Sequence, residues 1–282
     1  MRLAEAIAER RARGGALLAT NFYNVETLRA VLAAARATGA DLILQASPST
    51  IDYLGLAMTA AMARTAAQQE GVRAWLHLDH ATDPALARRC VDAGFDSVMI
   101  DASERPFAEN VRLSAALVAY AHAAGVLVEA ELGYVPKLGQ TDDRSGFTAP
   151  DEAHAFARDT GVDLLAVAIG NVHGFYKREP ALDLARLAAI HAVVPVPLVL
   201  HGGSGLSAED WRAVIARGVC KINLATEIKD AFMRALKDTL AASDDIDLRR
   251  TFPVATAAAA ALVERKLRIV TPIGEAHEQA AR

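Results

Sequence analysis

The segment WLHLDHATDP, residues 75–84, ends an apolar run with the side chains of His77, Asp79 and His80. Burying an ionised carboxylate without a partner costs several kcal/mol. We therefore expect that these side chains either satisfy one another or hold a charged ligand. His77 is separated from His80 by an odd spacing, so on a regular strand it faces the opposite side, and we assign it a structural or supporting role.

Two further histidines, His173 and His201, also follow apolar runs. A single histidine is usually structural, and this is the interpretation of the histidines that fall in helical stretches or in the tail, His122, His154, His191 and His277. Three imidazoles at the ends of three strands form a different pattern. They supply three neutral nitrogen ligands and leave a fourth position open, which is typical of catalytic Zn²⁺ sites.

Carboxylates accompany these histidines. Asp79 directly precedes His80, and if the backbone turns at the end of the strand, both side chains reach the same site. A carboxylate beside a metal but not bound to it suits a general acid or base. Asp101 and Glu131 also lie at or near strand ends. They can support the ligands, provide an alternative metal position, or form salt bridges with Arg or Lys.

Glycine-containing segments near the same strand ends suggest an anion site. The turn HGGSG (201–205) opens a helix, and helix N-termini present free N–H groups to anions. The segment KINLAT (221–226) offers Asn223 and Thr226 in a similar way, and GNVHGFYK (170–177) adds Gly174 and Lys177. Lys177 can equally be a solvated surface charge.

These side chains need a scaffold that brings distant strand ends together. Short apolar runs predict eight strands, at 16–22, 41–47, 73–79, 97–103, 126–133, 164–170, 197–203 and 219–226. Between and after them, Ala-rich segments predict helices at 25–38, 52–70, 83–93, 106–124, 150–160, 181–193, 207–217 and 226–241. The even alternation favours an α/β protein with a closed (β/α)₈ TIM barrel over an open doubly wound sheet.

No linker or internal repeat divides the chain, so we expect one domain over residues 1–282. Residues 245–282 predict an additional C-terminal helix. Residues 133–148, GYVPKLGQTDDRSGFT, form an unusually long loop, which is either a functional lid or an ordinary insertion.

The composition restricts the classes of function. With 52% hydrophobic but only 5% aromatic residues, the core is largely aliphatic, which suits repeated packing of helices on strands. A net charge of −4 gives no reason to expect nucleic acid or a membrane as a partner. The two cysteines show no metal or disulfide pattern, and no signal peptide or membrane span is apparent, so we expect a cytoplasmic protein.

The sequence resembles the class II, metal-dependent ketose-bisphosphate aldolases. The similarity follows the family's order up to about residue 240. The matching segments are NVETLRAVLAAA (24–35), HLDH (77–80), VMIDAS (98–103), VEAELG (128–133), AVAIGNVHGFYK (166–177), LVLHGGSGL (198–206) and KINLATE (221–227).

The resemblance implies that His80, His173 and His201 bind zinc and that Asp79 is the catalytic acid and base. Asp101 and Glu131 match secondary metal-site acids. The positions that match the binding site for dihydroxyacetone phosphate are Gly174, Lys177, Gly202, Ser204, Asn223 and Thr226. The resemblance further implies a monovalent cation, Na⁺ or K⁺, near the phosphate and a homodimer or homotetramer.

The sequence departs from the family pattern at two places. Thr141 or a neighbour stands where the family has a proton-exchanging glutamate, for which Asp142 or Asp143 can substitute. Ala225 replaces an aspartate that is usual in fructose-bisphosphate enzymes and resembles the tagatose-bisphosphate type. We therefore expect a tagatose-bisphosphate-like, a fructose-bisphosphate-like or another ketose 1-phosphate substrate.

Three rival interpretations remain open. A Schiff-base aldolase needs an inward lysine on a strand, and Lys221 is the lysine on a predicted strand. A non-catalytic companion subunit of a sugar-phosphate aldolase should lack metal ligands, which this chain retains. A metal-dependent sugar-phosphate epimerase shares the architecture.

Overall fold

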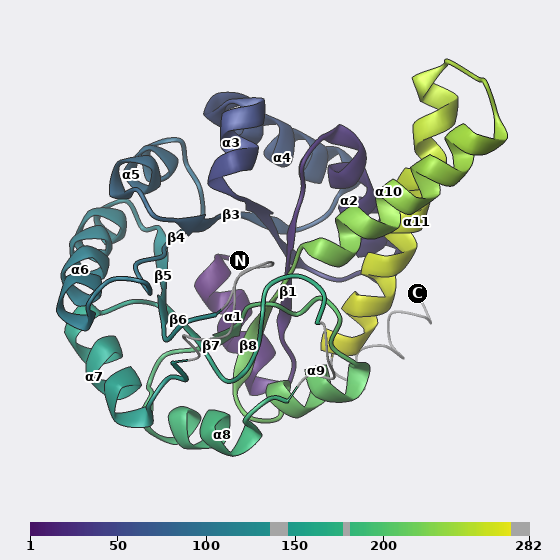
Figure 1. The fold of residues 1–282 in the computed structure, drawn as a ribbon. Helices are drawn as coiled ribbons and strands as arrows, with labels where there is room; N and C mark the ends of the chain where they lie inside the picture. The colour runs from purple at the N-terminus through teal and green to yellow at the C-terminus, as the bar shows by residue number, and fades with distance from the viewer. Residues whose placement is uncertain (136–145, 177–180, 272–282) are drawn as a thin grey trace.

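The computed structural model describes residues 1–135, 146–176 and 181–271. In this part of the chain, eight parallel strands close into a barrel, each strand pairing with the next and the last with the first (Figure 1). The strands are β1 (Leu17–Asn21), β2 (Leu42–Ala46), β3 (Ala74–Ala81), β4 (Ser97–Ile100), β5 (Leu127–Leu132), β6 (Leu164–Val167), β7 (Leu198–Leu200) and β8 (Val219–Leu224). The expected (β/α)₈ barrel is confirmed.

Helices surround the strands on the outside, with the exception of the first helix (Figure 1). They are α1 (Leu3–Ala12), α2 (Val25–Thr38), α3 (Pro48–Leu54), α4 (Leu56–Glu70), α5 (Pro84–Asp92), α6 (Phe107–Ala123), α7 (Pro150–Thr160), α8 (Leu184–Val193), α9 (Ala208–Ile215), α10 (Thr226–Ala242) and α11 (Leu248–Val270). No described helix is long and apolar enough to cross a membrane.

Local sequence signals explain where several helices begin. Asp83 accepts hydrogen bonds from the first backbone N–H groups of α5, and Pro84 occupies the first helical position. Ser207 and Asp210 form a capping box at the start of α9. The single helix expected at 52–70 is instead two helices, α3 and α4, because Gly55 between them adopts a φ of 85° that interrupts the helix.

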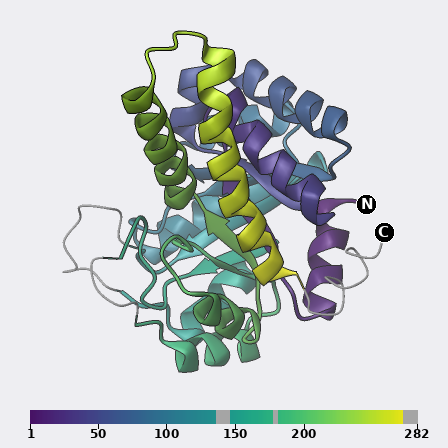
Figure 2. The same ribbon diagram turned by 90° about the vertical axis from the view of Figure 1, so that its right-hand side faces the viewer.

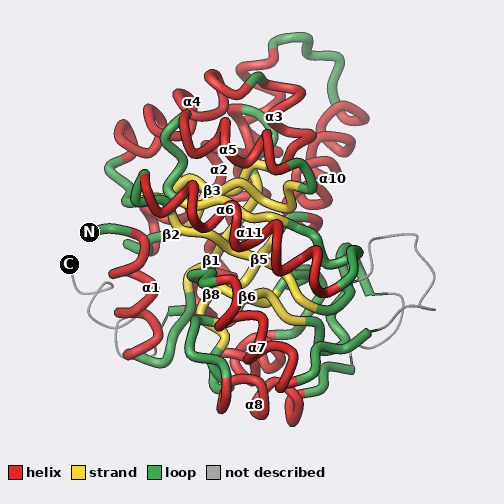
Figure 3. The backbone as a smooth tube through the Cα atoms, turned by 90° about the vertical axis from the view of Figure 1, so that its left-hand side faces the viewer, coloured by secondary structure: helices red, strands yellow, loops and turns green. Residues whose placement is uncertain are grey.

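Two helices lie outside the repeating strand–helix pattern. The expected C-terminal helix is α11, which packs against α2 and α10. Figure 2 shows α10 and α11 side by side, forming an arm that extends beyond the barrel. Helix α1 is not among the elements expected from the sequence. It lies at one end of the barrel (Figure 3).

Helix α1 closes that end with its apolar residues, and we call this region the barrel floor. Leu3, Ala6 and Ile7 share one face of the helix and are buried. They pack against inward-facing residues of the strands, namely Leu17, Ala19, Ile43, Trp75, Leu164, Ala166, Val199 and Cys220. The floor is therefore apolar, and the polar side chains of the barrel interior lie above it.

Candidate active site

The end of β3 changes direction, and this change brings Asp79 and His80 to one site. Pairing between β3 and β4 shifts between Leu78 and Ala81, and His80 has a φ of 52°. This left-handed conformation is uncommon for a residue with a side chain and costs on the order of 1 kcal/mol. It turns the ring of His80 toward the barrel interior, where it lies beside Asp79, with its Nε2 atom 4.0 Å from Oδ1.

The expected orientation of His77 is wrong. His77 does not lie on the opposite face of the barrel from His80, because the turn at His80 breaks the alternation of the strand. Its Nδ1 atom lies 2.6 Å from Ser97 Oγ, and its Nε2 atom lies 3.9 Å from Glu129. His77 is buried in the interior beneath the site, consistent with the supporting role assigned to it.

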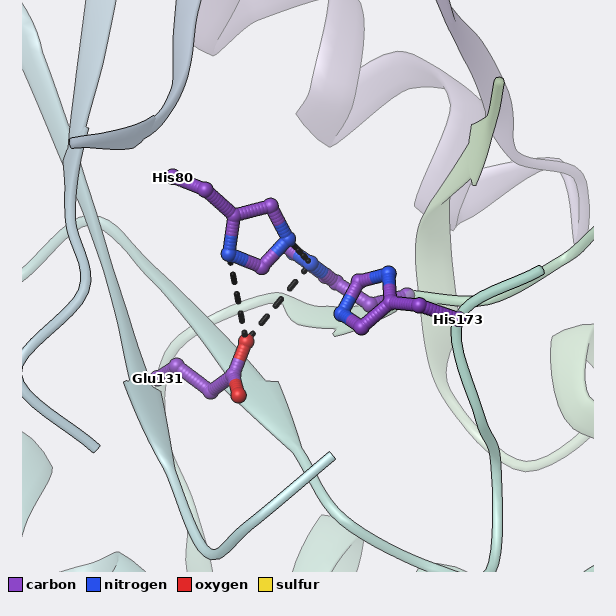
Figure 4. A group of neighbouring side chains, drawn as sticks. His80, Glu131 and His173 are labelled. Carbon is purple, nitrogen blue, oxygen red and sulfur yellow. Dashed lines mark hydrogen bonds and ion pairs between the residues drawn. The ribbon is translucent and has the colours of Figure 1, made fainter. Parts of the chain in front are cut away.

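Three histidines, one at the end of β3 and two that follow β6 and β7, meet at the barrel mouth. Potential ligand atoms of His80, Glu131, His173 and His201 all lie within 4.8 Å of one another. Figure 4 shows His80, Glu131 and His173 pointing toward a common centre. The ring of His80 lies 4.7 Å from that of His173 and 4.4 Å from that of His201, measured between centroids.

Carboxylates fix which nitrogen of two of these rings carries a proton. Asp101 accepts from Nδ1 of His80 at 2.8 Å, and Glu129 accepts from Nε2 of His201 at 2.9 Å. The remaining nitrogens, Nε2 of His80 and Nδ1 of His201, face each other at 2.6 Å. Two lone pairs in this position repel unless a proton or a cation lies between them.

The donor set fits a divalent metal. Nε2 of His173 is buried and has no hydrogen-bond partner among the described residues. With the facing nitrogens of His80 and His201, this makes three convergent imidazole ligands, and Glu131 adds a carboxylate. Imidazoles held by carboxylates through their other nitrogen are the usual arrangement around zinc.

The pKa values of the rings agree with this arrangement. Burial lowers the pKa of His173 and His201 far below the ordinary value, and the neighbouring His80 lowers both further. These two rings are therefore neutral, the form that binds metals. Burial also lowers the pKa of His80, but Asp79, Asp101 and Glu131 outweigh it and raise the pKa to about 9. A metal must therefore displace a proton from His80.

Three amide side chains hold the carboxylate of Asp79. Asn21 and Gln45 donate hydrogen bonds to it at 3.0 Å, and Asn223 donates one at 3.2 Å. Burial raises the pKa of Asp79, but His80 and Lys221, together with the Asn21 hydrogen bond, bring the pKa below its ordinary value. Asp79 is therefore a carboxylate, able to accept a proton.

Asn21 and Gln45 were not identified from the sequence. Both lie near the carboxyl ends of strands, β1 and β2, the location that singled out the other polar residues. The same rule applied to every strand would have found them. Neither residue titrates or commonly binds zinc, so their types alone gave no signal.

A buried ion pair lies beneath the histidines. Lys221 Nζ lies 2.7 Å from Glu129 Oε2, and both side chains are fully buried. The lysine required by the Schiff-base alternative is therefore held in a buried ion pair with a carboxylate, whereas a nucleophilic lysine needs a free amine.

The glycine turn lies beside the histidine cluster. Gly202 has a φ of 68°, and a Cβ atom there would collide with the backbone of Val172. Ser204 is buried, and Thr226 is the first residue of α10. Gly174 adopts a φ of 95° in the segment that follows His173. Lys177 and the loop positions Thr141, Asp142 and Asp143 lie outside the described residues.

Comparisons with known proteins agree with this architecture. Residues 1–275 match the sequence family described as class-II fructose-bisphosphate aldolase. Among solved structures, the YdjI aldolase from Escherichia coli K12 is 31% identical with a TM-score of 0.87, and the alignment covers 97% of this chain and 98% of that one.

Two further structures are similar. A putative fructose-1,6-bisphosphate aldolase from Coccidioides immitis is 32% identical with a TM-score of 0.89, covering 98% of both chains. The fructose-bisphosphate aldolase Fba from Campylobacter jejuni is 24% identical with a TM-score of 0.82, covering 95% of this chain and 93% of that one. This last similarity is one of fold.

Proposed function

The chain belongs to the class II fructose-bisphosphate aldolase family and is therefore a lyase, and we propose that it cleaves a ketose phosphate or bisphosphate reversibly in a zinc-dependent reaction. The products are dihydroxyacetone phosphate and an aldehyde. The observation that carries this proposal is the convergence of His80, His173 and His201 beside the ionised Asp79.

His80, His173 and His201 would hold the zinc ion, and Asp101 and Glu131 would support it or offer a second position. When bound, zinc would act as a Lewis acid that withdraws charge from the carbonyl group of the substrate. Glu129 and Asp101 orient two of the rings through their other nitrogens. A monovalent cation, Na⁺ or K⁺, near the phosphate is part of the proposal.

Asp79 moves the proton in the proposed reaction. Its carboxylate accepts the proton of the C4 hydroxyl, the C3–C4 bond breaks, and the bonding electrons move toward the C2 carbonyl while the aldehyde leaves. The hydrogen bonds from Asn21, Gln45 and Asn223 hold the carboxylate in place. In synthesis, the protonated Asp79 returns the proton to the new hydroxyl group.

The phosphate-bearing half of the substrate is assigned to the glycine turn and its neighbours. The proposed contacts are Gly174, Lys177, Gly202, Ser204, Asn223 and Thr226. Ala225 between β8 and α10 favours a tagatose-bisphosphate-like substrate over a fructose-bisphosphate-like one, with another ketose 1-phosphate as a further possibility. For proton exchange at C3, we propose that Asp142 or Asp143 substitutes for the family glutamate, whose place Thr141 or a neighbour takes.

A metal-replete cleavage assay tests the function. Fructose, tagatose and other ketose 1-phosphates and 1,6-bisphosphates are supplied in turn, and release of the aldehyde is measured. We expect cleavage of at least one, loss of activity with a chelator, and recovery with Zn²⁺. Failure with every ketose phosphate in the presence of bound zinc would contradict the proposed cleavage.

We also propose that copies of the chain associate as a homodimer or homotetramer through the α10–α11 arm. The arm exposes large apolar side chains, among them Ile246 with 94% of its surface accessible, as well as Leu240, Leu248 and Val254. Exposed apolar groups of this kind mark association surfaces. Sedimentation analysis should show that Ile246→Glu with Leu248→Glu reduces the oligomer to smaller species, and an unchanged mass would exclude this surface.

A further inference from the structure

Trp211 and Glu227 form hydrogen bonds with three successive residues of the glycine turn, Gly203, Ser204 and Gly205. Trp211 donates its indole N–H to the carbonyl oxygen of Gly203 at 3.1 Å. The backbone N–H of Glu227 donates to Ser204 Oγ at 3.3 Å, and Oε1 of Glu227 accepts from the N–H of Gly205 at 2.5 Å. The turn therefore depends on Trp211 and Glu227 for its conformation.

Lys266 joins these two supports. Its Nζ atom lies 2.9 Å from Oε1 of Glu227, the same oxygen that accepts from Gly205. It also lies 4.7 Å from the centre of the Trp211 ring, within cation–π distance. Lys266 is only 9% exposed. Lys266 belongs to α11. A helix outside the eight strand–helix repeats therefore contacts the residues that support the glycine turn.

The charge of Glu227 creates a problem for an anion site. Its carboxylate accepts a hydrogen bond from the backbone N–H of Gly205 and therefore lies close to the proposed phosphate site. Like charges at short range repel strongly where water is excluded. A phosphate group on the front of the turn would therefore be disfavoured by an uncompensated Glu227. Lys266 places a positive charge against the same carboxylate oxygen and removes the repulsion.

We propose that Lys266 is a positioning residue for binding of the substrate phosphate, because it neutralises Glu227 and holds the glycine turn through Glu227 and Trp211. This inference rests on the proposed function, which assigns the phosphate to Gly202 and Ser204. It gives α11 a role in substrate affinity in addition to its packing against α2 and α10.

Lys266→Met tests the proposal, since methionine keeps much of the volume and removes the charge. We expect KM for the cleaved ketose phosphate and the Kd of dihydroxyacetone phosphate to rise about tenfold, the effect of one uncompensated charge at this range. Binding of unphosphorylated dihydroxyacetone and zinc content should not change, and kcat should change by less than KM.

A double variant separates the effect of the lost Lys266 charge from the effect of lost side-chain packing. In Lys266→Met combined with Glu227→Gln, the repelling charge is gone and the glutamine oxygen can still accept from Gly205. We expect phosphate affinity to return to within about threefold of the original value, and Lys266→Arg to retain it. The matched control is Arg268→Gln, which removes an exposed cation of α11 paired with Glu264 and should leave Kd unchanged.

Inorganic phosphate, measured by calorimetry on the zinc-loaded protein, gives the readout that does not depend on turnover. An unchanged phosphate Kd in Lys266→Met, or no recovery in the double variant, would overturn the role of Lys266. If the original protein cleaves no ketose phosphate but shows this loss and recovery of phosphate binding, the proposed function fails and the role of Lys266 stands.

Discussion

The two ends of the barrel interior both contain buried side chains but are chemically opposite. The floor is formed by apolar side chains such as Leu17, Ile43 and Trp75, sealed by helix α1. The mouth contains Asp79 and His201, which are also buried. Between the two ends, Lys221 and Glu129 form an ion pair. One closed sheet thus has an apolar end that packs and a polar end that can do chemistry.

The comparison shows how the fold can tolerate a costly site. Burying apolar surface at the floor stabilises the barrel by roughly 25 cal/mol for each Å² removed from water. At the mouth, buried polar groups and the left-handed backbone of His80 each oppose folding, and their hydrogen bonds only offset the cost. Stability therefore comes from residues that take no part in the reaction. Substitutions at the floor should lower the free energy of unfolding, whereas substitutions at the mouth should reduce zinc binding or turnover.

The largest expected effect is the loss of a histidine at the mouth. His80→Ala and His201→Ala should each abolish bound zinc and cleavage together, because a site with three nitrogen ligands cannot spare one. The fold should persist, since the floor is untouched. Metal analysis and circular dichroism check both parts. Full activity in either variant, or after complete removal of zinc by a chelator, would contradict the proposed role of the metal.

Asp79→Ala should separate catalysis from metal binding at the same end of the barrel. The histidines keep their positions, so zinc should remain bound at its original stoichiometry. Turnover should fall by roughly 10²–10⁴-fold, the usual contribution of a positioned acid or base. The measurement is kcat with saturating substrate. An unchanged kcat would exclude Asp79 as the group that moves the C4 hydroxyl proton.

Lys221→Met probes the layer between the two ends. Removing the lysine leaves Glu129 buried and charged, which should reduce the free energy of unfolding by about 3–5 kcal/mol. Adding Glu129→Gln should recover much of this loss, because the glutamine is neutral and still accepts the hydrogen bond from His201. Urea unfolding measures both variants. A single variant as stable as the original protein would show that the ion pair is not needed to keep Glu129 buried.

The sequence predicted the barrel because parallel strands buried on both faces leave a strong pattern of short apolar runs between helices. It also singled out the three histidines, since His80 and His201 lie at or next to strand ends and His173 follows β6 after a short segment. In a (β/α)₈ barrel, the carboxyl ends of all the parallel strands lie at the same end of the barrel, so residues that follow different strands can meet at one mouth. The metal-binding and catalytic roles of these residues stay predictions until they are measured.

Other features could not be obtained in this way because they depend on local backbone geometry or on distant contacts. The orientation of His77 was wrong, since nothing in the residue types revealed the left-handed conformation of His80. Helix α1 was missed because only three apolar residues on one face, Leu3, Ala6 and Ile7, determine its position. The link from Lys266 to the glycine turn joins segments that are about sixty residues apart.

The smallest expected effect lies at the floor, and it sharpens the comparison most. Ile7→Val removes one buried methylene between α1 and the strands, which should lower the free energy of unfolding by about 1 kcal/mol. Zinc content, kcat and KM should all stay at their original values, because Ile7 belongs to the apolar floor and the proposed reaction takes place at the mouth. Urea unfolding and steady-state kinetics on the same preparation make the test. A change in KM or in zinc content without a change in stability would mean that the floor is coupled to the mouth, and the division of the barrel into a stabilising end and a reactive end would be wrong.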